Sequence, residues 1–309
     1  MTGVVGAIAP IFLLIVAGYA FKRRGFPGDQ FWSPAEHLSY FVLLPALIVH
    51  TLAGAELAGI RIGELAAAVI AMALATTALV ILVRPFLRID GPAFTSIFQG
   101  AIRLNAYIGF AFAFTFYGTP GLTIAAVFVA LMMPIVNTIC VAVLVAFGSG
   151  GRASWSGIAI GVATNPLILA CLAGAALNPV ASAVPGWVIG FLGILAQAAL
   201  PLALLCVGAG LDFSSLGARR WIILATSAYK LAVLPVLAWG IVELIGLTGP
   251  SFAVVMLFAA TPASPSTYVM ARQLGGDASL MAGIVTAQTA LSVLSMSVVL
   301  ILIGKLAAG

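Results

Sequence analysis

Long runs of apolar residues recur from one end of this chain to the other, and they constrain its fold more than any other feature. Residues 63–83 read "GELAAAVIAMALATTALVILV", and runs of the same kind follow one another with short connections. A helix of about 20 apolar residues crosses the hydrocarbon core of a bilayer. The alternating pattern of a membrane β-barrel does not occur. The sequence therefore predicts an all-α integral membrane protein.

Composition supports this prediction, because the chain is 63% hydrophobic and only 7% charged. Ordinary soluble domains carry about 25% charged residues. The basic residues are scattered between apolar runs, which does not favour a nucleic-acid-binding protein. Ten runs are predicted to span the membrane, and no connection is long enough for a soluble domain. The predicted spans lie near residues 4–21, 33–53, 63–83, 92–117, 120–147, 156–177, 186–210, 221–246, 251–272 and 279–303.

The basic residues also predict the orientation, because Lys and Arg concentrate in cytoplasmic loops. With both termini outside, only Arg61 and Lys305 fall on the outer side, and Arg103 and Lys230 lie within spans. The basic residues on the cytoplasmic side are Lys22, Arg23, Arg24, Arg84, Arg88, Arg152, Arg219, Arg220 and Arg272. Positive charge follows the first apolar run instead of preceding it, so we expect that helix to be retained and not cleaved as a signal peptide.

Two pairs of similar segments indicate an internal repeat. "LLPALIVHTLAGAEL" (Leu43–Leu57) resembles "ALPLALLCVGAGLDF" (Ala199–Phe213), and "NAYIGFA" from Asn105 resembles "STYVMAR" from Ser266. The matches occur in the same order, about 156 to 161 residues apart. Five spans in each half is an odd number, so the second half is predicted to be inverted, as in many secondary transporters. The predicted halves are residues 1–150 and 151–309.

Helix-breaking residues lie in corresponding spans of the two halves. In "ATPASPSTY" (Ala260–Tyr268), Pro262 and Pro265 each remove a backbone donor, which predicts a broken ninth span. A proline kink is the alternative. In the fourth span, Asn105 and Gly109 are the predicted break. Hydroxyl groups that could contact a substrate at the second break belong to Thr261, Ser264, Ser266 and Thr267.

An intramembrane arginine near such a break needs an explanation, because it costs about 2.5–3.5 kcal/mol at the bilayer centre. Half-helices that begin at mid-membrane present partial positive charge. Together with Arg103, Asn105 and Ser266, they would favour an anion, most simply a carboxylate. Two alternatives are that Arg103 caps the negative ends of half-helices or extends to the cytoplasmic edge.

The motifs resemble the auxin efflux carrier family, which includes plant PIN-type auxin exporters and bacterial malate or malonate permeases. They are "RLNAYIG" from Arg103, the proline-rich segment followed by "STYV", "ARQLGGD" (Ala271–Asp277), "YKLAVLPVLA" (Tyr229–Ala238) and "MPIVNTICV" (Met133–Val141). The resemblance covers essentially the whole chain. Asn105 matches the asparagine that family members carry in each crossover, whereas Ser266 replaces the second one. The long cytoplasmic loop of the plant exporters is absent.

This resemblance implies the fold of bile-acid/sodium symporters and sodium/proton antiporters, with spans four and nine crossing at their broken centres. Spans one, two, six and seven would form a scaffold, through which the protein forms a homodimer. Spans three to five and eight to ten would form a mobile transport domain that works as an elevator. The resemblance also implies a bacterial cytoplasmic membrane.

Other polar residues within spans have two interpretations each. Lys230 is expected to steady the crossover by facing the carbonyl ends of the broken helices, with proton coupling as the alternative. His50 is expected to lie on the scaffold. Asn137 and Gln288 could line the substrate cavity or form interhelical hydrogen bonds. Tyr107 and Tyr268 occupy matching positions of the repeat and are added to the candidate substrate site.

The function predicted from these features is a secondary transporter for a small organic anion. The alternatives are a sodium- or proton-coupled carrier of another solute class and a channel-like facilitator. A membrane-embedded enzyme is not favoured, because the chain lacks paired aspartates, a Ser–His arrangement and a zinc motif. No cofactor or metal site is predicted, and the three cysteines are expected to be packing residues.

Overall fold

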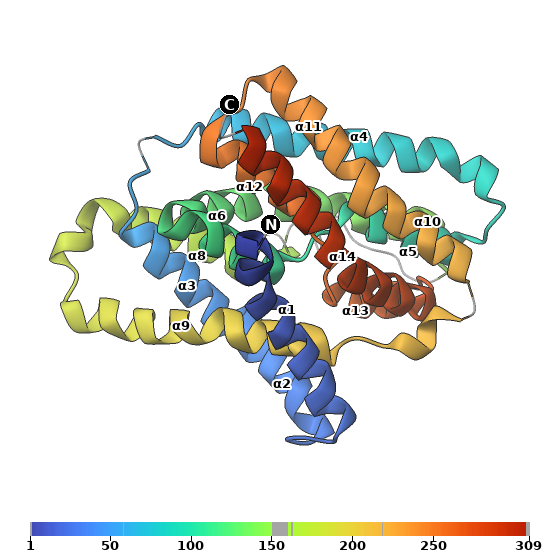
Figure 1. Ribbon diagram of the computed structural model, residues 1–309, viewed down its shortest axis with the longest axis horizontal. Helices are drawn as coiled ribbons and strands as arrows, with labels where there is room; N and C mark the ends of the chain where they lie inside the picture. The colour runs from blue at the N-terminus through green and yellow to red at the C-terminus, as the bar shows by residue number, and fades with distance from the viewer. Residues whose placement is uncertain (1, 58, 150–159, 162, 218, 307–309) are drawn as a thin grey trace. The chain divides into compact units, whose positions relative to one another are not determined.

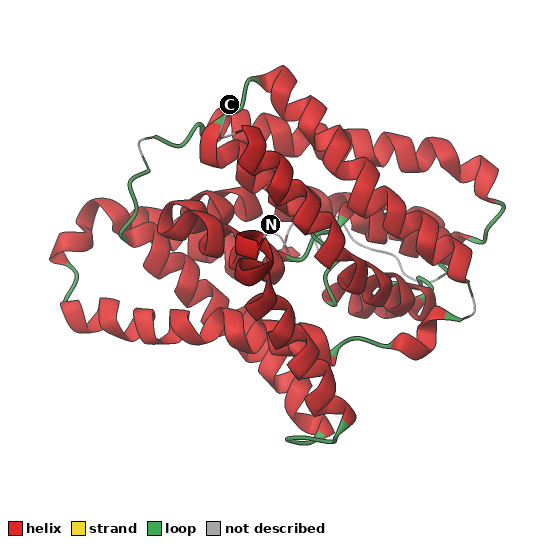
Figure 2. Cartoon of the chain, in the orientation of Figure 1, coloured by secondary structure: helices red, strands yellow, loops and turns green. Residues whose placement is uncertain are grey.

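The computed structural model describes residues 2–57, 59–149, 160–161, 163–217 and 219–306, and every regular element in these ranges is helical (Figure 1, Figure 2). The α-helices are α1 (Thr2–Arg23), α2 (Asp29–Leu38), α3 (Leu44–Ala53), α4 (Ile62–Leu87), α5 (Gly91–Ile102), α6 (Ala106–Phe147), α8 (Pro166–Leu177), α9 (Gly186–Ala209), α10 (Arg220–Ala228), α11 (Leu234–Ile245), α12 (Gly249–Ala259), α13 (Ser266–Gln273) and α14 (Ala278–Leu306). The short elements are η1 (Ser39–Leu43), η2 (Asn178–Ala183), η3 (Phe213–Leu216) and η4 (Tyr229–Val233). The predicted all-α class is confirmed.

Among the described residues, eight helical stretches are long and apolar enough to cross a membrane. Two differences separate this number from the ten predicted spans. Residues Gly91–Phe147 form one stretch of 57 residues that contains both the fourth and the fifth predicted span. The ninth predicted span is divided into α12 and α13, which have 11 and 8 residues. These helices define a multi-pass membrane protein, and the number of ten spans remains a prediction.

Two π-helical turns have a common cause in the sequence. In both η1 and η4, the turn is followed by a leucine and then a proline, Pro45 in one case and Pro235 in the other. Proline has no N–H and its ring displaces the carbonyl four residues earlier. The preceding turn widens as a result, which is how π-bulges arise within longer helices.

The chain divides into two compact units. The first consists of Met1–Ile62, Tyr107–Ala130 and Ile160–Gly210, and the second of Gly63–Ala106, Leu131–Ala159 and Leu211–Gly309. In the first unit, α9 packs against α1, α2 and α3, and α3 packs against α8. The side chain of Asn178 closes the C-terminal end of α3 by donating hydrogen bonds of 2.8 Å to the carbonyls of Leu52 and Ala55.

Glycine allows α1 and α9 to approach at backbone distance. A Cβ atom added to Gly18 would lie 1.9 Å from the carbonyl oxygen of Leu205. One added to Gly208 would lie 1.8 Å from the carbonyl oxygen of Ile15. Small residues at helix interfaces are the usual means by which membrane helices pack closely. The two glycines therefore set the contact between these helices.

In the second unit, α14 contacts four other α-helices, α5, α10, α12 and α13. The apolar core between them is continuous, and its members lie on α5, α10, α13, α14 and the segment before α13. They are Ala93, Ile97, Ile223, Ala263, Ala271, Leu280, Met281, Ile284, Val285 and Ala287.

The helices α5 and α12 are the most enclosed elements of the second unit. Every residue from Ala93 to Ile102 and from Ser251 to Ala259 is buried. A helix that is buried on all faces is expected to be apolar on all faces. The sequence of α12 is apolar apart from Ser251, whereas α5 also carries the buried polar residues Thr95, Ser96 and Gln99. Both helices also open with Gly-Pro, and Pro is favoured in the first turn because its missing N–H is not needed there.

Candidate functional site

The chain between α5 and α6 is not helical at Arg103, Leu104 and Asn105. Arg103 has the extended conformation with φ −75° and ψ 148°. Asn105 directly precedes the first residue of α6, the place where the short polar side chains that disfavour helix interiors are preferred. Gly109, by contrast, lies inside α6, so its assignment to the break is wrong. The kink in α6 is instead at Gly118, where φ is 58°.

A second interruption separates α12 from α13. Residues 260–265 are not helical, and they include Pro262 and Pro265. The segment "GPAF" from Gly91 and the segment "GPSF" from Gly249 begin the two helices that precede these interruptions. This match lies 158 residues apart along the chain and was missed by the sequence reasoning, although it can be read there. Each interruption is thus preceded by a buried helix of 11 or 12 residues that starts with Gly-Pro.

Arg103 is buried at the first interruption, with only 8% of its surface exposed. Its guanidinium donates one hydrogen bond of 2.8 Å to the side-chain oxygen of Asn137 and another of 2.8 Å to the sulfur of Met270. Both acceptors are neutral side chains on other helices. These contacts and this burial differ from the two alternatives, in which Arg103 caps helix carbonyls or extends to the membrane edge.

Gln288 connects the two interruptions. Its side-chain oxygen accepts a hydrogen bond of 2.8 Å from the backbone N–H of Ala263, between α12 and α13. Its side-chain nitrogen donates one of 2.9 Å to the carbonyl of Gly100, near the end of α5. Helix ends and breaks leave such backbone groups without partners inside the helix. Gln288, which is completely buried, supplies partners for one of them at each break.

The hydroxyl groups near the second interruption bond mainly to nearby atoms of the same segment. Thr261 donates to the carbonyl of Phe258 at 2.7 Å, and Thr267 donates to that of Ser264 at 2.6 Å. The Ser266 hydroxyl donates to that of Ser264 at 3.1 Å, in an exposed position. The two predicted partners in the repeat therefore differ in environment, because Asn105 is completely buried and Ser266 is exposed.

The remaining predicted residues lie in different places. Tyr107 belongs to the first unit, where it is buried, whereas Tyr268 belongs to the second and is 38% exposed. His50 packs beside Gly193 of α9 within the first unit. Lys230 lies in the π-helical turn η4 and is 1% exposed. In the part of the chain that the structure describes, Lys230 has no hydrogen-bond or ion-pair partner, so the expected contact with helix carbonyls is not found there.

Three further buried polar side chains of the second unit were not singled out from the sequence. Gln99 on α5, Ser227 on α10 and Thr289 on α14 are each 0% or 1% exposed. Their side-chain polar atoms have no hydrogen-bond partner among the described residues. The three helices contact one another. Single polar letters in apolar runs were the available signal, but a sequence does not reveal which of them remain without partners.

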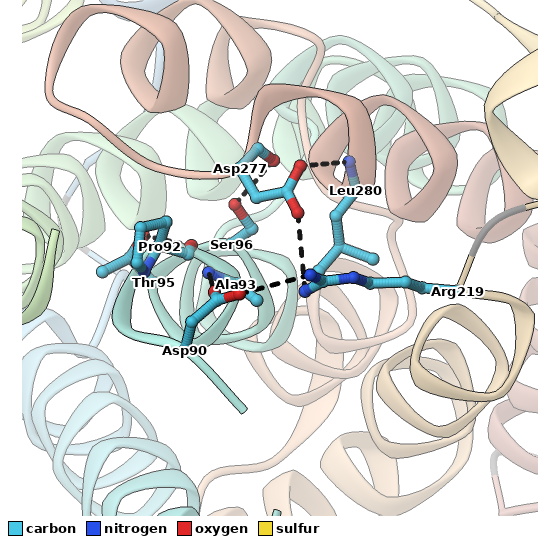
Figure 3. A network of polar contacts seen from close by, with 8 residues as sticks. All are labelled: Asp90, Pro92, Ala93, Thr95, Ser96, Arg219, Asp277 and Leu280. Atoms are coloured by element: carbon cyan, nitrogen blue, oxygen red, sulfur yellow. Dashed lines mark hydrogen bonds and ion pairs between the residues drawn. The ribbon is translucent and has the colours of Figure 1, made fainter. Parts of the chain in front are cut away.

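A network of charged residues fixes one end of the second unit (Figure 3). Asp90 accepts a hydrogen bond of 2.8 Å from the N–H of Ala93 at the start of α5, and Asp277 accepts one of 2.9 Å from Leu280 at the start of α14. The Arg219 guanidinium lies 3.2 Å from a carboxylate oxygen of Asp90 and 3.6 Å from one of Asp277. The Ala93 N–H and Arg219 hold the pKa of Asp90 below its ordinary value.

A metal centre is not indicated by the described residues, because no three His, Cys, Asp or Glu side chains among them gather at one place. The features that remain are two helix interruptions, a buried arginine with neutral partners, and an amide that connects the interruptions. Together with eight long apolar helices, they define a multi-pass membrane protein with a polar centre in its second unit.

Comparison with known proteins gives the class of this membrane protein. Residues 156–300 match the family described as "Membrane transport protein", and the resemblance to the auxin efflux carrier family is thereby confirmed. A protein named "Uncharacterized transporter" from Methanothermobacter thermautotrophicus is 26% identical over 295 residues, which cover 94% of this chain and 95% of the relative. The similarity to this relative extends over nearly the whole length of the chain.

Proposed function

We propose that this protein is a secondary transporter that moves a small organic anion, most simply a carboxylate, across the bacterial cytoplasmic membrane. The observation that carries this proposal is the environment of Arg103. Its side chain is buried, and among the described residues no carboxylate pairs with it, since its two side-chain partners are Asn137 and Met270. A guanidinium has five N–H donors and matches a carboxylate in geometry. An anionic substrate would offset the cost of burying this charge.

The two interruptions support the same proposal. The helices α6 and α13 begin directly after them, and the N-terminal end of a helix carries partial positive charge. In transporters built from inverted repeats, substrates bind near the bilayer midplane, where such half-helices begin. We assign the substrate site to Arg103 and Asn105 at the first interruption, with Ser264 and Ser266 contributing at the second.

The helices α5 and α12 support the proposed internal repeat. Each proposed half contains a buried helix that starts with Gly-Pro-Ala/Ser-Phe and ends at an interruption. The intervals differ slightly, because the first glycines are 158 residues apart and Asn105 and Ser266 are 161 apart. A longer second break accounts for this difference, since residues 260–265 are interrupted there and residues 103–105 in the first half. Two inverted five-helix halves, with both termini outside, are our proposal for the topology.

The division into two compact units supports an elevator mechanism. The first unit contains α1, α2, α3, α8 and α9, which correspond to the proposed scaffold, and we place the homodimer interface there. The second contains α4, α5 and α10 to α14, which correspond to the proposed transport domain. The proposal needs one adjustment, because Tyr107–Ala130 groups with the first unit.

Uptake by proteoliposomes tests the proposed function. Dicarboxylates, aromatic carboxylates and amino acids would be screened with and without sodium. For any transported carboxylate, we expect Arg103→Gln and Asn105→Ala to reduce uptake at least tenfold. Arg272→Gln, which removes an exposed arginine from α13, serves as the matched control and should leave uptake unchanged. Unchanged uptake with Arg103→Gln would show that the site assignment is wrong.

Lys230 favours a proton-coupled form of this transport. A completely buried lysine with no counter-ion in the described part of the chain is a group that can exchange its proton when its surroundings change. Ionisable residues inside membranes commonly serve as proton relays. We therefore propose coupling to a proton gradient as a second feature of the transport. It can be tested separately from the substrate site, because it depends on Lys230.

A further inference from the structure

Two cavities of the second unit meet at the ends of two membrane-spanning helices. One, of about 520 Å³, is lined by the segment after α4 and the start of α10. The other, of about 510 Å³, runs along α4, α5, α10 and η4. Ile89, Trp221 and Ile222 line both cavities, so the two cavities adjoin, and we treat them together as one depression.

The first cavity is basic. Arg88, Arg219 and Arg220 line it, together with a single acidic residue, Asp90. Arg219 is already paired with Asp90 and Asp277. Arg88 and Arg220 are exposed, and neither forms an ion pair with any residue in the described ranges. The Arg220 guanidinium lies 5.8 Å from the ring centre of Trp221. Two uncompensated positive charges therefore remain at this end of the helices.

The second cavity is an apolar groove. Its walls are Leu79, Val80, Val83, Leu87, Ile89, Ile97, Ala101, Trp221, Ile222, Ala225, Thr226, Tyr229 and Val233. It extends from the end of α4 at Leu87 to Leu79, about 12 Å along the helix. Both flanking stretches, Ile62–Leu87 and Arg220–Ile245, are long and apolar enough to span the membrane. The groove therefore lies where lipid chains surround the protein.

We propose that this depression binds one anionic phospholipid, with its phosphate at Arg88 and Arg220 and an acyl chain in the groove. Charge and position both select this ligand. Basic pockets at the membrane surface between helices bind anionic headgroups, and a chain of methylene groups matches the apolar walls. Trp221 is 74% exposed, and tryptophan is enriched where membrane proteins meet the headgroup region. A zwitterionic headgroup would bring a second positive charge towards the two arginines.

The conformation of Arg88 allows a specific test. Its φ is +47°, a left-handed conformation that asparagine tolerates better than most residues. The double variant Arg88→Asn/Arg220→Gln therefore removes both charges and preserves the turn. Arg24→Gln/Arg272→Gln removes two exposed arginines elsewhere and is the charge-matched control. Ala225→Trp fills the groove from an exposed position, and Ala228→Trp, also exposed on α10 but outside the groove, is its control.

Binding of dioleoylphosphatidylglycerol and dioleoylphosphatidylcholine to the full-length protein would be measured by native mass spectrometry. We expect phosphatidylglycerol to bind more tightly, and the double arginine variant to weaken it about 25-fold, or about fivefold per arginine. Ala225→Trp should weaken both lipids, whereas the two controls should leave binding unchanged.

Three results would overturn the proposal. The first is equal affinity for the two lipids, which would mean that charge is not recognised. The second is unchanged phosphatidylglycerol binding in the double arginine variant. The third is binding of sn-glycerol 3-phosphate as tight as that of the lipid, with no effect of Ala225→Trp, which would indicate a site for free phosphate compounds. Because the site lies outside the proposed substrate residues, these results are independent of the carboxylate uptake experiment.

Discussion

The guanidinium of Arg103 and the side-chain oxygen of Asn137 lie 2.8 Å apart, and their hydrogen bond connects the interruption after α5 to the far part of α6. An uncharged amide orients the arginine but does not neutralise it. The arginine therefore keeps its charge available in a buried place.

Asn137→Asp should convert the orienting contact into an ion pair and thereby block an anionic substrate. The side chains have nearly the same shape, so we expect normal expression and thermal stability. A carboxylate 2.8 Å from the guanidinium competes directly with the substrate carboxylate, and uptake in proteoliposomes should fall at least tenfold. Asn137→Ala is the comparison, because it removes the orienting group without adding charge and should cost less. Uptake at the wild-type rate in Asn137→Asp would contradict an anion site at Arg103.

Gln288→Leu should destabilise the protein by about 2–6 kcal/mol, since it leaves the N–H of Ala263 and the carbonyl of Gly100 buried without their described partner. Gln99→Leu is the matched control. Gln99 is equally buried, and its side-chain atoms have no partner among the described residues, so replacing it should be neutral or stabilising. Unfolding in detergent, followed by circular dichroism, measures both variants. Equal losses of stability would show that the Gln288 hydrogen bonds are not special.

Gly208→Ala should disturb the contact between α1 and α9. The added methyl group would lie 1.8 Å from the carbonyl oxygen of Ile15, so the backbones must separate. Such overpacking costs about 1–3 kcal/mol, and we expect a lower melting temperature in detergent. Gly190→Ala lies on the same helix and meets no atom within 4 Å, so it should behave like the wild type. A melting temperature unchanged by Gly208→Ala would mean that the two helices are less tightly packed than described.

The carboxylate of Asp90 should contribute to stability at neutral pH but not in acid. Its folded-state pKa lies below the ordinary value of 3.8, because the charged form is held by Ala93 and Arg219. The contribution is complete above the ordinary pKa and disappears as the pH falls through the lower, folded-state pKa. Asp212, whose pKa is lowered by the hydroxyls of Ser214 and Ser215, adds in the same direction. Asp90 is exposed, so we expect only about 0.3–1 kcal/mol from its charge.

The comparison of wild type with Asp90→Asn isolates this effect, because asparagine also caps helices. The difference in melting temperature should be present at pH 7, decrease below about pH 4, and be reduced by 0.5 M salt through screening. A difference that is constant over this range would assign the effect to the cap geometry alone.

Lys230→Met should abolish the dependence of transport on a pH gradient if this lysine carries the coupled proton. The variant should also be at least as stable as the wild type, since it removes a buried charge that has no counter-ion among the described residues. Uptake would be measured with an imposed pH gradient and without one. Transport that still responds to the gradient would exclude Lys230 as the coupling group.

The sequence revealed the class of the protein and the neighbourhood of its polar centre, for reasons that are local. Apolar runs of helical length predict helices, and the prolines and Asn105 disfavour helix interiors. The prediction that Gly109 belongs to the break was wrong, because a glycine alone does not end a helix, and α6 begins three residues earlier at Ala106.

The partners of the polar residues could not be predicted, because they depend on how separate helices pack. Nothing in the letters indicates that Gln288 contacts both Gly100 and Ala263, which are 163 residues apart. The same applies to Arg103 and Met270. Gly91 and Gly249, which open α5 and α12 and are each followed by proline, could have been found with a closer reading of the sequence. They form a third match of the internal repeat, and proline is favoured in the first turn of a helix.

The double attachment of Gln288 has a mechanical consequence. The side-chain amide of Gln288 forms hydrogen bonds at both helix interruptions, and Gln288 itself lies on a third helix, α14. Neither the end of α5 nor the segment before α13 can move away from Gln288 alone without leaving a buried backbone group without its hydrogen-bond partner. With these hydrogen bonds intact, any movement of the segment around Arg103 would involve α5, the segment before α13 and α14 together.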